Sequence, residues 1–435
     1  MAAPPLVACQ HCAALHERTA IEPGEMAACV RCGYVLYRRS SISLNGWLAL
    51  TTGALIFFAI AHLFPVAVLN IQGVTVKASF PGALFLSWEQ GHRALAVMTG
   101  LLGFWIPLTE LLFLLWALQA VRSGRPPRDF AYGMRLMHLV APWSMTPVVM
   151  LGILIAMVQF SGLATLHIGP ALGAFGALTV LMTALSRMSA QRIWHYAEDA
   201  GVVPVARVDA LANQVTATCL SCGYIQPAAK QHGSDECQRC HARIHYRKPD
   251  PNNRVWALII AATITYLPAN ILPVMQVRGP TGAGDHTILG GVLRLWEMNS
   301  WGLAIIVFAA SVVVPMTKLL ALAALLLGRR WKGWVVQRQR TRLYELIEFI
   351  GQWSMLDVFV VILLGAMANF PGISQIIPGP GAVSFGLVVI LTMLATLSYD
   401  PRRGWDRAPS RSPAGAVQSA SAEAGGLPIK SGTVS

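Results

Sequence analysis

Charged residues are scarce in this sequence: they make up 12% of its 435 residues, whereas a soluble domain carries about 25%. Hydrophobic residues make up 55%. These proportions argue against a soluble globule. Apolar runs of about the 20 residues that cross a bilayer occur at 47–71, 95–121, 132–158, 171–190, 255–276, 302–327, 343–369 and 381–399. We therefore predict an all-α polytopic membrane protein with eight spans.

Two further absences narrow the class of protein. The sequence has no G-x-x-x-x-G-K-[ST] phosphate-binding loop, so ATP hydrolysis by this chain is not expected. Residues 1–43 have neither the basic start nor the apolar core of a cleaved signal peptide, so we expect the N-terminus to stay in the cytoplasm. We predict a protein that binds no nucleotide and is not an enzyme.

The net charge of +13 follows the expected topology. With the N-terminus inside, 28 of the 33 Lys and Arg residues lie in cytoplasmic segments: before the first span, in 122–135, 187–254 and 329–342, and after 400. The outer loops hold Lys77, Arg93, Arg278 and Arg294. The positive-inside rule therefore favours eight spans with both termini in the cytoplasm, and no nucleic-acid partner is expected.

The sequence repeats itself at an offset of about 208 residues. Pro107-Leu108-Thr109 corresponds to Pro315-Met316-Thr317, and, at an offset of 210, Trp143-Ser144-Met145 corresponds to Trp353-Ser354-Met355. Each half has an even number of spans and begins inside, so we predict two parallel four-helix repeats related by an axis along the membrane normal. Val74-Thr75-Val76-Lys77-Ala78 alternates in polarity and is a candidate strand in an outer loop.

We expect five segments along the chain. They are a zinc ribbon at 1–43, a first transmembrane repeat at 44–195, a linker and second zinc ribbon at 196–250, a second transmembrane repeat at 251–403, and a disordered cytoplasmic tail at 404–435. The tail is rich in Ser, Ala, Gly and Pro, a composition that cannot support a core.

All eight cysteines fall in two sets of paired C-x-x-C motifs: Cys9, Cys12, Cys29 and Cys32, and Cys219, Cys222, Cys237 and Cys240. Each set supplies the four thiolates of a closed tetrahedral zinc site. We predict two Zn²⁺ ions per chain, each contributing much of the folding free energy of a ribbon too small to bury a core. The reducing cytoplasm disfavours disulfides, and a redox switch is the alternative. A closed site leaves no open position for catalysis.

Two charged residues occupy equivalent positions inside spans. Glu110 and Lys318 each lie three residues after a proline, Pro107 or Pro315. Charged groups within a span are costly and mark functional sites by default. Because equivalent sites can face each other across the axis between the halves, we predict a Glu110 to Lys318 ion pair, with a purely structural bridge as the alternative.

A third charged residue, Asp357, lies deep in the seventh span. It shares a helical face with Trp353 and Ser354, and Glu348 belongs to a polar stripe nearer the cytoplasmic end of the same span. The first half has Pro147 in place of Asp357, so a charge-dependent step is expected in the second half. Buried carboxylates such as Asp357 and Glu110 can carry protons, which makes proton coupling a hypothesis.

Prolines fall in matched places. Pro65 corresponds to Pro268 and Pro273 near the outer ends of the first spans, and Pro107 corresponds to Pro315 in mid-span. Broken helices line cavities in many transporters, but proline is also common in membrane helices generally. Both interpretations stay open.

The duplicated C-x-x-C pairs, Pro268-Ala269-Asn270-Ile271-Leu272-Pro273, the Pro-x-Thr and Trp-Ser-Met motifs and Tyr399-Asp400-Pro401-Arg402 together resemble the paraquat-inducible protein A family, which includes the LetA-type lipid transport proteins. The resemblance covers about residues 5–407. It implies a Gram-negative inner-membrane protein that works with a periplasm-spanning MCE-domain partner to move lipids between membranes. The first half keeps only Pro65 of the Pro-x-Asn-x-x-Pro pattern, so any mechanism implied by the family belongs chiefly to the second half.

We therefore expect a subunit of an intermembrane phospholipid transport system that exchanges lipid with a periplasmic MCE-domain protein. The alternatives are a passive anchor or assembly factor for the MCE tunnel, and a thiol- or zinc-based redox stress sensor. The transport and coupling candidates are Asp357, Lys318, Glu110, Glu348, Ser354, Trp353, Asn270, Pro268, Pro273, Pro315 and Pro107.

Overall fold

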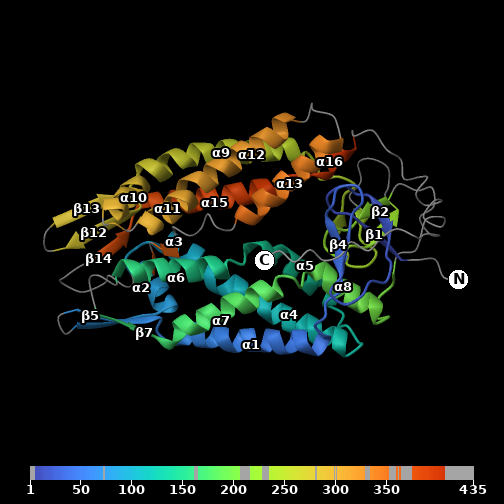
Figure 1. The fold of residues 1–435 in the computed structure, drawn as a ribbon, viewed down its shortest axis with the longest axis horizontal. Coiled ribbons are helices and arrows are strands. Elements are labelled where there is room, and N and C mark those ends of the chain that lie inside the picture. The colour runs from blue at the N-terminus through green and yellow to red at the C-terminus, as the bar shows by residue number, and fades with distance from the viewer. Residues whose placement is uncertain are drawn as a thin grey trace.

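The computed structural model describes residues 5–71, 74–160, 165–205, 216–227, 235–279, 282–297, 299, 301–328, 334–351, 359–360, 362–363 and 375–406. Two groups of long helices lie side by side, one from each half of the chain (Figure 1). Hairpins that carry the cysteines lie at one end of these helices, and two small sheets lie at the other end.

The first membrane region begins with α1 (Leu44–Leu63), which Ser43 caps by accepting a hydrogen bond of 3.2 Å from the Gly46 N–H. The elements that follow are β5 (Ala67–Ile71), β6 (Val74–Ala78), α2 (Phe80–Glu89), α3 (Arg93–Gly100), the π-helix η1 (Leu101–Trp105), α4 (Ile106–Arg122), α5 (Phe130–Val140), the 3₁₀-helix η2 (Ala141–Trp143), α6 (Thr146–Phe160), β7 (Thr165–Ile168), α7 (Pro170–Leu185) and α8 (Ala190–Asp199).

The second membrane region contains a similar series. Its elements are α9 (Pro251–Ile271), β12 (Met275–Gly279), β13 (Gly282–His286), α10 (Ile288–Glu297), α11 (Trp301–Phe308), the π-helix η4 (Ala309–Val313), α12 (Val314–Leu327), α13 (Trp334–Gly351), β14 (Gln375–Pro378), α15 (Pro380–Ser398) and α16 (Arg402–Trp405). The first residues of β5 and β12, Ala67 and Met275, are 208 positions apart, as are Leu101 and Ala309 at the starts of the two π-helices. From α1 to α4 and from α9 to α12 the elements follow the same order, at the offset of the sequence repeat, whereas η2 and α6 have no counterpart among the described residues of the second region.

Six helices in the described parts of the chain are long and apolar enough to cross a membrane: Leu44–Leu63, Arg93–Arg122, Phe130–Met157, Pro251–Ile271, Ala304–Leu327 and Pro380–Trp405. The pair α7 and α8, bent by 56° at its break, would be a seventh. Of the eight predicted spans, the one at 343–369 falls partly outside the described residues.

Two of the predicted spans end earlier than their apolar runs. The run at 47–71 gives a helix only to Leu63, because Pro65 follows and Ala67–Ile71 forms strand β5. The run at 255–276 ends as a helix at Ile271, just before Pro273 and strand β12. An apolar strand and the end of an apolar helix look alike in sequence, which is why these boundaries were wrong.

Each membrane region carries a three-stranded antiparallel sheet at the end opposite the cysteines. The strand orders are β6-β5-β7 and β13-β12-β14. The strand predicted at Val74–Ala78 is present as β6. The all-α prediction is therefore right for the membrane helices, and the outer strand suggested at Val74–Ala78 is part of one of two three-stranded sheets whose extent was not predicted.

A glycine after β7 and one after β14 lie against the backbone that follows α1 and α9, respectively. A Cβ on Gly169 would lie 2.1 Å from the Pro65 carbonyl oxygen, and one on Gly379 would lie 2.1 Å from the Pro273 carbonyl oxygen. Only glycine leaves room for this backbone contact. The matched prolines Pro65 and Pro273 thus lie just before strands β5 and β12, in contact with the glycines that precede α7 and α15.

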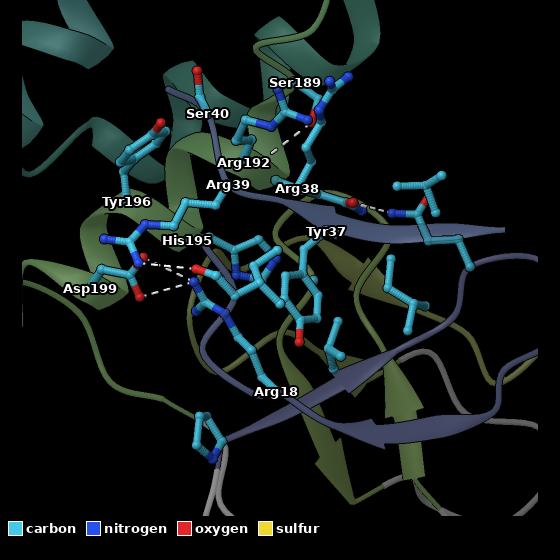
Figure 2. A pocket seen from close by; sticks show the side chains of 18 of the residues that line it. Arg18, Tyr37, Arg38, Arg39, Ser40, Ser189, Arg192, His195, Tyr196 and Asp199 are labelled. Carbon is cyan, nitrogen blue, oxygen red and sulfur yellow. Dashed lines mark hydrogen bonds and ion pairs between the residues drawn. The ribbon is translucent and has the colours of Figure 1, made fainter. Parts of the chain in front are cut away.

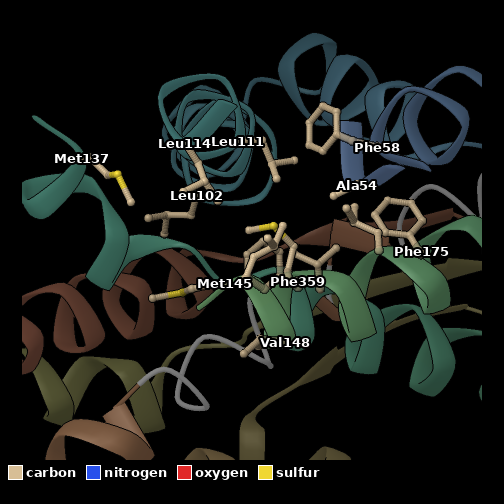
Figure 3. Close-up of a cluster of buried hydrophobic side chains, with 14 of the residues drawn as sticks. Ala54, Phe58, Leu102, Leu111, Leu114, Met137, Met145, Val148, Phe175 and Phe359 are labelled. Carbon is tan, nitrogen blue, oxygen red and sulfur yellow. The ribbon is translucent and has the colours of Figure 1, made fainter. Parts of the chain in front are cut away.

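The main apolar core joins both membrane regions. Phe58 of α1, Leu111 of α4 and Phe175 of α7 surround it, and Phe359 enters from the second half (Figure 3). A Cβ on Gly152 would lie 3.2 Å from the Phe359 Cβ, so this glycine lets the two halves approach closely. The two membrane regions therefore share one core.

The cysteine motifs lie in short antiparallel hairpins. The first pair of hairpins is β1 (Leu6–Ala8) with β2 (Leu15–Glu17) and β3 (Met26–Ala28) with β4 (Val35–Arg38). The second pair is β8 (Thr216–Thr218) with β9 (Ile225–Pro227) and β10 (Asp235–Glu236) with β11 (Arg243–Ile244). We call these pairs the first ribbon and the second ribbon.

Candidate functional site

The four cysteine sulfurs of each ribbon converge on one point. In the first ribbon, Sγ of Cys9 lies 3.5 Å from that of Cys32, and Sγ of Cys12 lies 3.5 Å from that of Cys29. In the second ribbon the same distance of 3.5 Å joins Cys219 to Cys240 and Cys222 to Cys237. All eight residues are buried, and the four sulfurs of each set lie within 4.8 Å of one another.

One turn geometry is used in all four knuckles. The residue after the second cysteine has a positive φ in each case: Ala13 (59°), Gly33 (84°), Gly223 (74°) and His241 (55°). The N–H of that residue donates to the carbonyl of the first cysteine of the knuckle at 2.8 to 2.9 Å. This left-handed position suits glycine, and the sequence has glycine at two of the four sites.

The sulfur sets fit a tetrahedral metal ion. Zn–S bonds of about 2.3 Å place the sulfurs of a regular tetrahedron about 3.8 Å apart, close to the separations found here. The Nε2 atom of His16 lies 3.3 Å from Sγ of Cys29, so the ring can donate to a thiolate. Four sulfurs close the coordination shell, so a metal bound here supports the fold and has no open position for a substrate.

Each of the two ribbons contacts the membrane region in the other half of the chain. Arg31 of the first ribbon donates to the Trp405 carbonyl of α16 at 3.0 Å, and Trp405 packs against the four cysteines of that ribbon. Arg135 of α5 donates to the His241 carbonyl of the second ribbon at 3.2 Å. Each ribbon thus contacts the membrane region that it does not directly precede in sequence.

His11 adds a second contact between the first ribbon and the second membrane region. Its ring stacks on Tyr34 at 3.9 Å between centroids and meets the edge of Tyr344 at 5.9 Å. Burial lowers the pKa of His11 to about 4. This shift favours the neutral ring, which lies 3.2 Å from the carboxylate of Glu345 on α13.

Glu198, near the end of α8, joins the two ribbons. Its carboxylate binds Arg18 of the first ribbon at 3.0 Å and also binds Arg239 of the second ribbon. Arg239 lies over the Trp194 ring at 4.5 Å, and only 2% of its side chain is exposed. Burial raises the pKa of Glu198, but the hydrogen bond from His195 and the charges of Arg239 and Arg18 outweigh this effect, so the pKa lies below its usual range. Sequence reasoning missed this group because its members are scattered over the chain.

Lys318 is buried in the second membrane region, with 1% of its surface exposed. Its ammonium donates to Oγ1 of Thr392 on α15 at 3.1 Å. Among the ion pairs of the described residues, there is none between Lys318 and Glu110. The predicted Glu110 to Lys318 pair is therefore wrong: Lys318 finds its partner within its own half.

Glu110 also has its partner within its own half. Its carboxyl group is hydrogen-bonded to Ser144, the serine of the first Trp-Ser-Met motif. The other carboxyl oxygen, Oε2, is buried and has no hydrogen-bond partner among the described residues. The equivalent positions in the second half are Lys318 and Ser354, so the charge at this place in the repeat has changed sign.

Asn270 and His62 occupy equivalent positions, 208 residues apart, on α9 and α1. The Asn270 amide donates to the Tyr266 carbonyl at 2.9 Å, and Nδ1 of His62 lies 2.8 Å from the Phe58 carbonyl. The His62 ring is surrounded by the rings of Phe58, Phe80, Phe104 and Phe175. His62 was missed in the sequence, although its alignment with Asn270 was a usable signal.

The remaining candidates fall into three groups. Pro107 and Pro315 each follow a π-helix inside a long helix, where a widened turn accommodates a residue without an N–H. Pro268 lies inside α9, and Pro273 lies beside Gly379. Glu348 is exposed on α13, whereas Trp353, Ser354 and Asp357 lie outside the described residues.

The chain is similar to proteins of one family. The family model described as paraquat-inducible protein A matches residues 44–198 and 252–409. Intermembrane transport protein PqiA of Escherichia coli (strain K12) is 30% identical over 415 residues, which cover 93% of this chain and 96% of that protein. Lipophilic envelope-spanning tunnel protein A of the same organism is 29% identical over 402 residues, covering 92% and 90% of the two chains. No solved structure was found to match the fold.

Proposed function

Because the chain belongs to the paraquat-inducible protein A family, we propose that it is the inner-membrane subunit of an intermembrane phospholipid transport system that exchanges lipid with a periplasmic MCE-domain protein. The ribbons and both termini then lie in the cytoplasm, and the two three-stranded sheets face the periplasm. The names of the relatives, which refer to intermembrane transport and to an envelope-spanning tunnel, support this assignment.

The observation that carries the proposal is the buried Lys318. A charged group in an apolar helix is costly, and the role of a passive anchor would not require one. Lys318 is 1% exposed and has a hydroxyl, not a carboxylate, as its partner. A group that can lose a proton, held next to a helix bulge, fits a step in which the membrane region changes its charge or shape.

Metal ions would act on the fold, not on the lipid. Cys9, Cys12, Cys29 and Cys32 would hold one Zn²⁺, and Cys219, Cys222, Cys237 and Cys240 would hold the other. The metal would supply the folding free energy of the ribbons, which have almost no core of their own. All eight cysteines of the sequence belong to these two sets, so a redox sensor would have to give up a structural site in order to respond.

The test separates a transporter from an anchor. Lys318→Met keeps the side-chain volume, and replacing a buried charge by an apolar group is commonly neutral or stabilising. We expect normal abundance and an unchanged or higher melting temperature, together with loss of the outer-membrane barrier to detergents and large antibiotics. Lys77→Met, in the exposed strand β6, removes the same charge and should keep the barrier intact. An intact barrier with Lys318→Met would favour the passive anchor.

Proton coupling is the finer part of the proposal. We propose that Asp357 and Glu110 are the acids involved and that Asp357 is the more sensitive. Asp357→Asn keeps the size and the hydrogen bonding of the side chain but cannot release a proton, so a structural role should survive it and proton coupling should not. The barrier assay at matched abundance decides between the two. Full activity of this variant would exclude Asp357 as a proton carrier.

A further inference from the structure

A pocket of about 1020 Å³ lies where the first ribbon meets α1 and α8. Its walls come from Arg38, Arg39 and Ser40 of the first ribbon and its linker, from Ser43 and Leu44 at the start of α1, and from Ser189 and Arg192 at the start of α8. Figure 2 shows Arg38, Arg192 and Ser189 gathered at one side of this pocket. The transport proposal does not depend on this pocket, although the inference below uses the membrane orientation proposed above.

The positive charges of the pocket are not all neutralised. The described lining holds two acids: Asp199 binds Arg18 at 2.9 Å, and Glu345 contacts His11. Glu198, which lies outside the lining, binds Arg18 at 3.0 Å and His195 at 2.9 Å. In the part of the chain that the structure describes, the guanidinium groups of Arg38 and Arg192 have no acidic partner.

Two helix N-termini add to the positive electrostatic potential of the pocket. Ser43 caps α1, a helix of 20 residues, and Ser189 caps α8, a helix of 10 residues, and both serines line the pocket. Free N–H groups at helix N-termini favour an anion. Burial and the like charges of Arg38 and Arg187 lower the pKa of Arg192, although Tyr196 opposes them. A bound anion would relieve this repulsion.

The apolar part of the lining indicates what kind of anion fits. Val35 is 43% exposed and Ile42 is 37% exposed, and both line the pocket beside Leu44, the first residue of a membrane-spanning helix. A free phosphate ester has few carbon atoms that could cover this apolar surface, whereas the glycerol and acyl carbons of a lipid could cover it. The cytoplasmic leaflet also carries the anionic headgroups that basic residues near a membrane attract.

We propose that this pocket binds the phosphate of an anionic phospholipid headgroup from the cytoplasmic leaflet, between Arg38 and Arg192. The headgroup would tie the first ribbon to the start of both helices. Because Leu44, the first residue of a helix long enough to cross a membrane, lines the pocket, the acyl chains of such a lipid would remain in the bilayer.

The experiment measures lipid binding to the whole chain. Delipidated protein in a neutral detergent is titrated with short-chain phosphatidylglycerol, and the bound lipid is counted by native mass spectrometry. We expect binding to weaken about fivefold for Arg38→Gln or Arg192→Gln and about 25-fold for the double variant. The matched control is Arg125→Gln with Arg128→Gln, which removes two exposed arginines from another cytoplasmic loop and should leave binding within about twofold.

Two further ligands distinguish the sources of phosphate. Phosphatidylcholine of the same chain length should bind much more weakly than phosphatidylglycerol, and glycerol 3-phosphate should compete only at far higher concentration. Equal loss of binding in the double variant and in the control would overturn the proposal. Competition by glycerol 3-phosphate as strong as by the lipid would also overturn it, because the ligand would then be a soluble phosphate ester. Arg38 is exposed, so the single variant Arg38→Gln gives a result even if the double variant folds poorly.

Discussion

Arg31, in the second knuckle of the first ribbon, donates a hydrogen bond of 3.0 Å to the backbone carbonyl of Trp405, 374 positions further along the chain. The same guanidinium lies 5.1 Å from the centre of the Trp405 ring. The first ribbon is therefore held by the last described helix of the second membrane region. This contact links the N-terminal ribbon to the second membrane region.

The contact between Arg31 and Trp405 should hold the first ribbon in place. Arg31→Gln removes the hydrogen bond and the cation–π contact, which together are worth about 1–2 kcal/mol. We expect faster amide hydrogen exchange in β1 to β4 and in α16. Arg243→Gln, an exposed arginine in the second ribbon, is the control and should leave exchange in the first ribbon unchanged.

Each chain should contain two zinc ions. Metal analysis of the purified protein should give a ratio close to two, and Cys222→Ser should reduce it to about one, because the other set of four cysteines is complete. The loss of one ion unfolds the second ribbon, so the abundance of the protein should fall. A ratio of zero or one in undamaged wild-type protein would contradict this prediction. Unchanged abundance with lost activity would indicate that the metal has a sensing role.

Breaking the Glu198 pairs should be far more damaging than breaking the neighbouring surface pair. Glu198→Gln leaves Arg239 buried without a carboxylate, which should cost about 3 kcal/mol. Asp199→Asn removes an exposed partner of Arg18 and should cost less than about 1 kcal/mol. Thermal unfolding, followed with exchange in both ribbons, measures the difference.

The same group should make stability depend on pH. Because the pKa of Glu198 is lowered in the folded protein, its stabilising effect is complete above the unfolded value of about 4.3 and is lost as the pH falls through the folded value. The difference in melting temperature between wild type and Glu198→Gln should therefore shrink below about pH 4. A constant difference down to pH 3 would argue against a charged Glu198 in the folded state.

Thr392 should matter only when Lys318 is present. Thr392→Val keeps the shape of the side chain but removes the oxygen that accepts from the buried ammonium, which should cost about 2 kcal/mol. In the Lys318→Met background the same change should cost less than about 1 kcal/mol. A double-mutant cycle of thermal stability measures this coupling. Equal costs in the two backgrounds would mean that the hydrogen bond does not stabilise the lysine.

The sequence was a good guide where local chemistry decides the structure. The spacing of Cys9, Cys12, Cys29 and Cys32 predicts a four-sulfur site, because a C-x-x-C knuckle can form only a narrow range of turns. Glycines such as Gly33 and Gly223 mark the left-handed positions of those turns. The matched prolines Pro107 and Pro315 mark a change in the helix, although not its form as a π-helix.

The sequence was a poor guide where distant parts of the chain decide. The repeat suggested that Glu110 and Lys318 face each other, but symmetry does not fix which helix each side chain meets, and Ser144 and Thr392 are the partners found. Trp405 was assigned to a disordered tail from composition, yet it is 1% exposed because it fills the space beneath the first ribbon. Such contacts depend on packing between helices that no local pattern records.

The contact between the first ribbon and Trp405 joins parts of the chain that are synthesised at very different times. The first ribbon leaves the ribosome first, but Trp405, on which it rests, is made 374 residues later. At about 5 to 20 residues per second, roughly 20 to 75 s pass between the synthesis of Arg31 and that of Trp405. During that interval the ribbon can contact only earlier elements such as α8, whose Glu198 binds Arg18, so metal bound to its four cysteines would contribute much of its stability. If that metal is zinc, as proposed above, a shortage of zinc should therefore destabilise unfinished chains before finished ones.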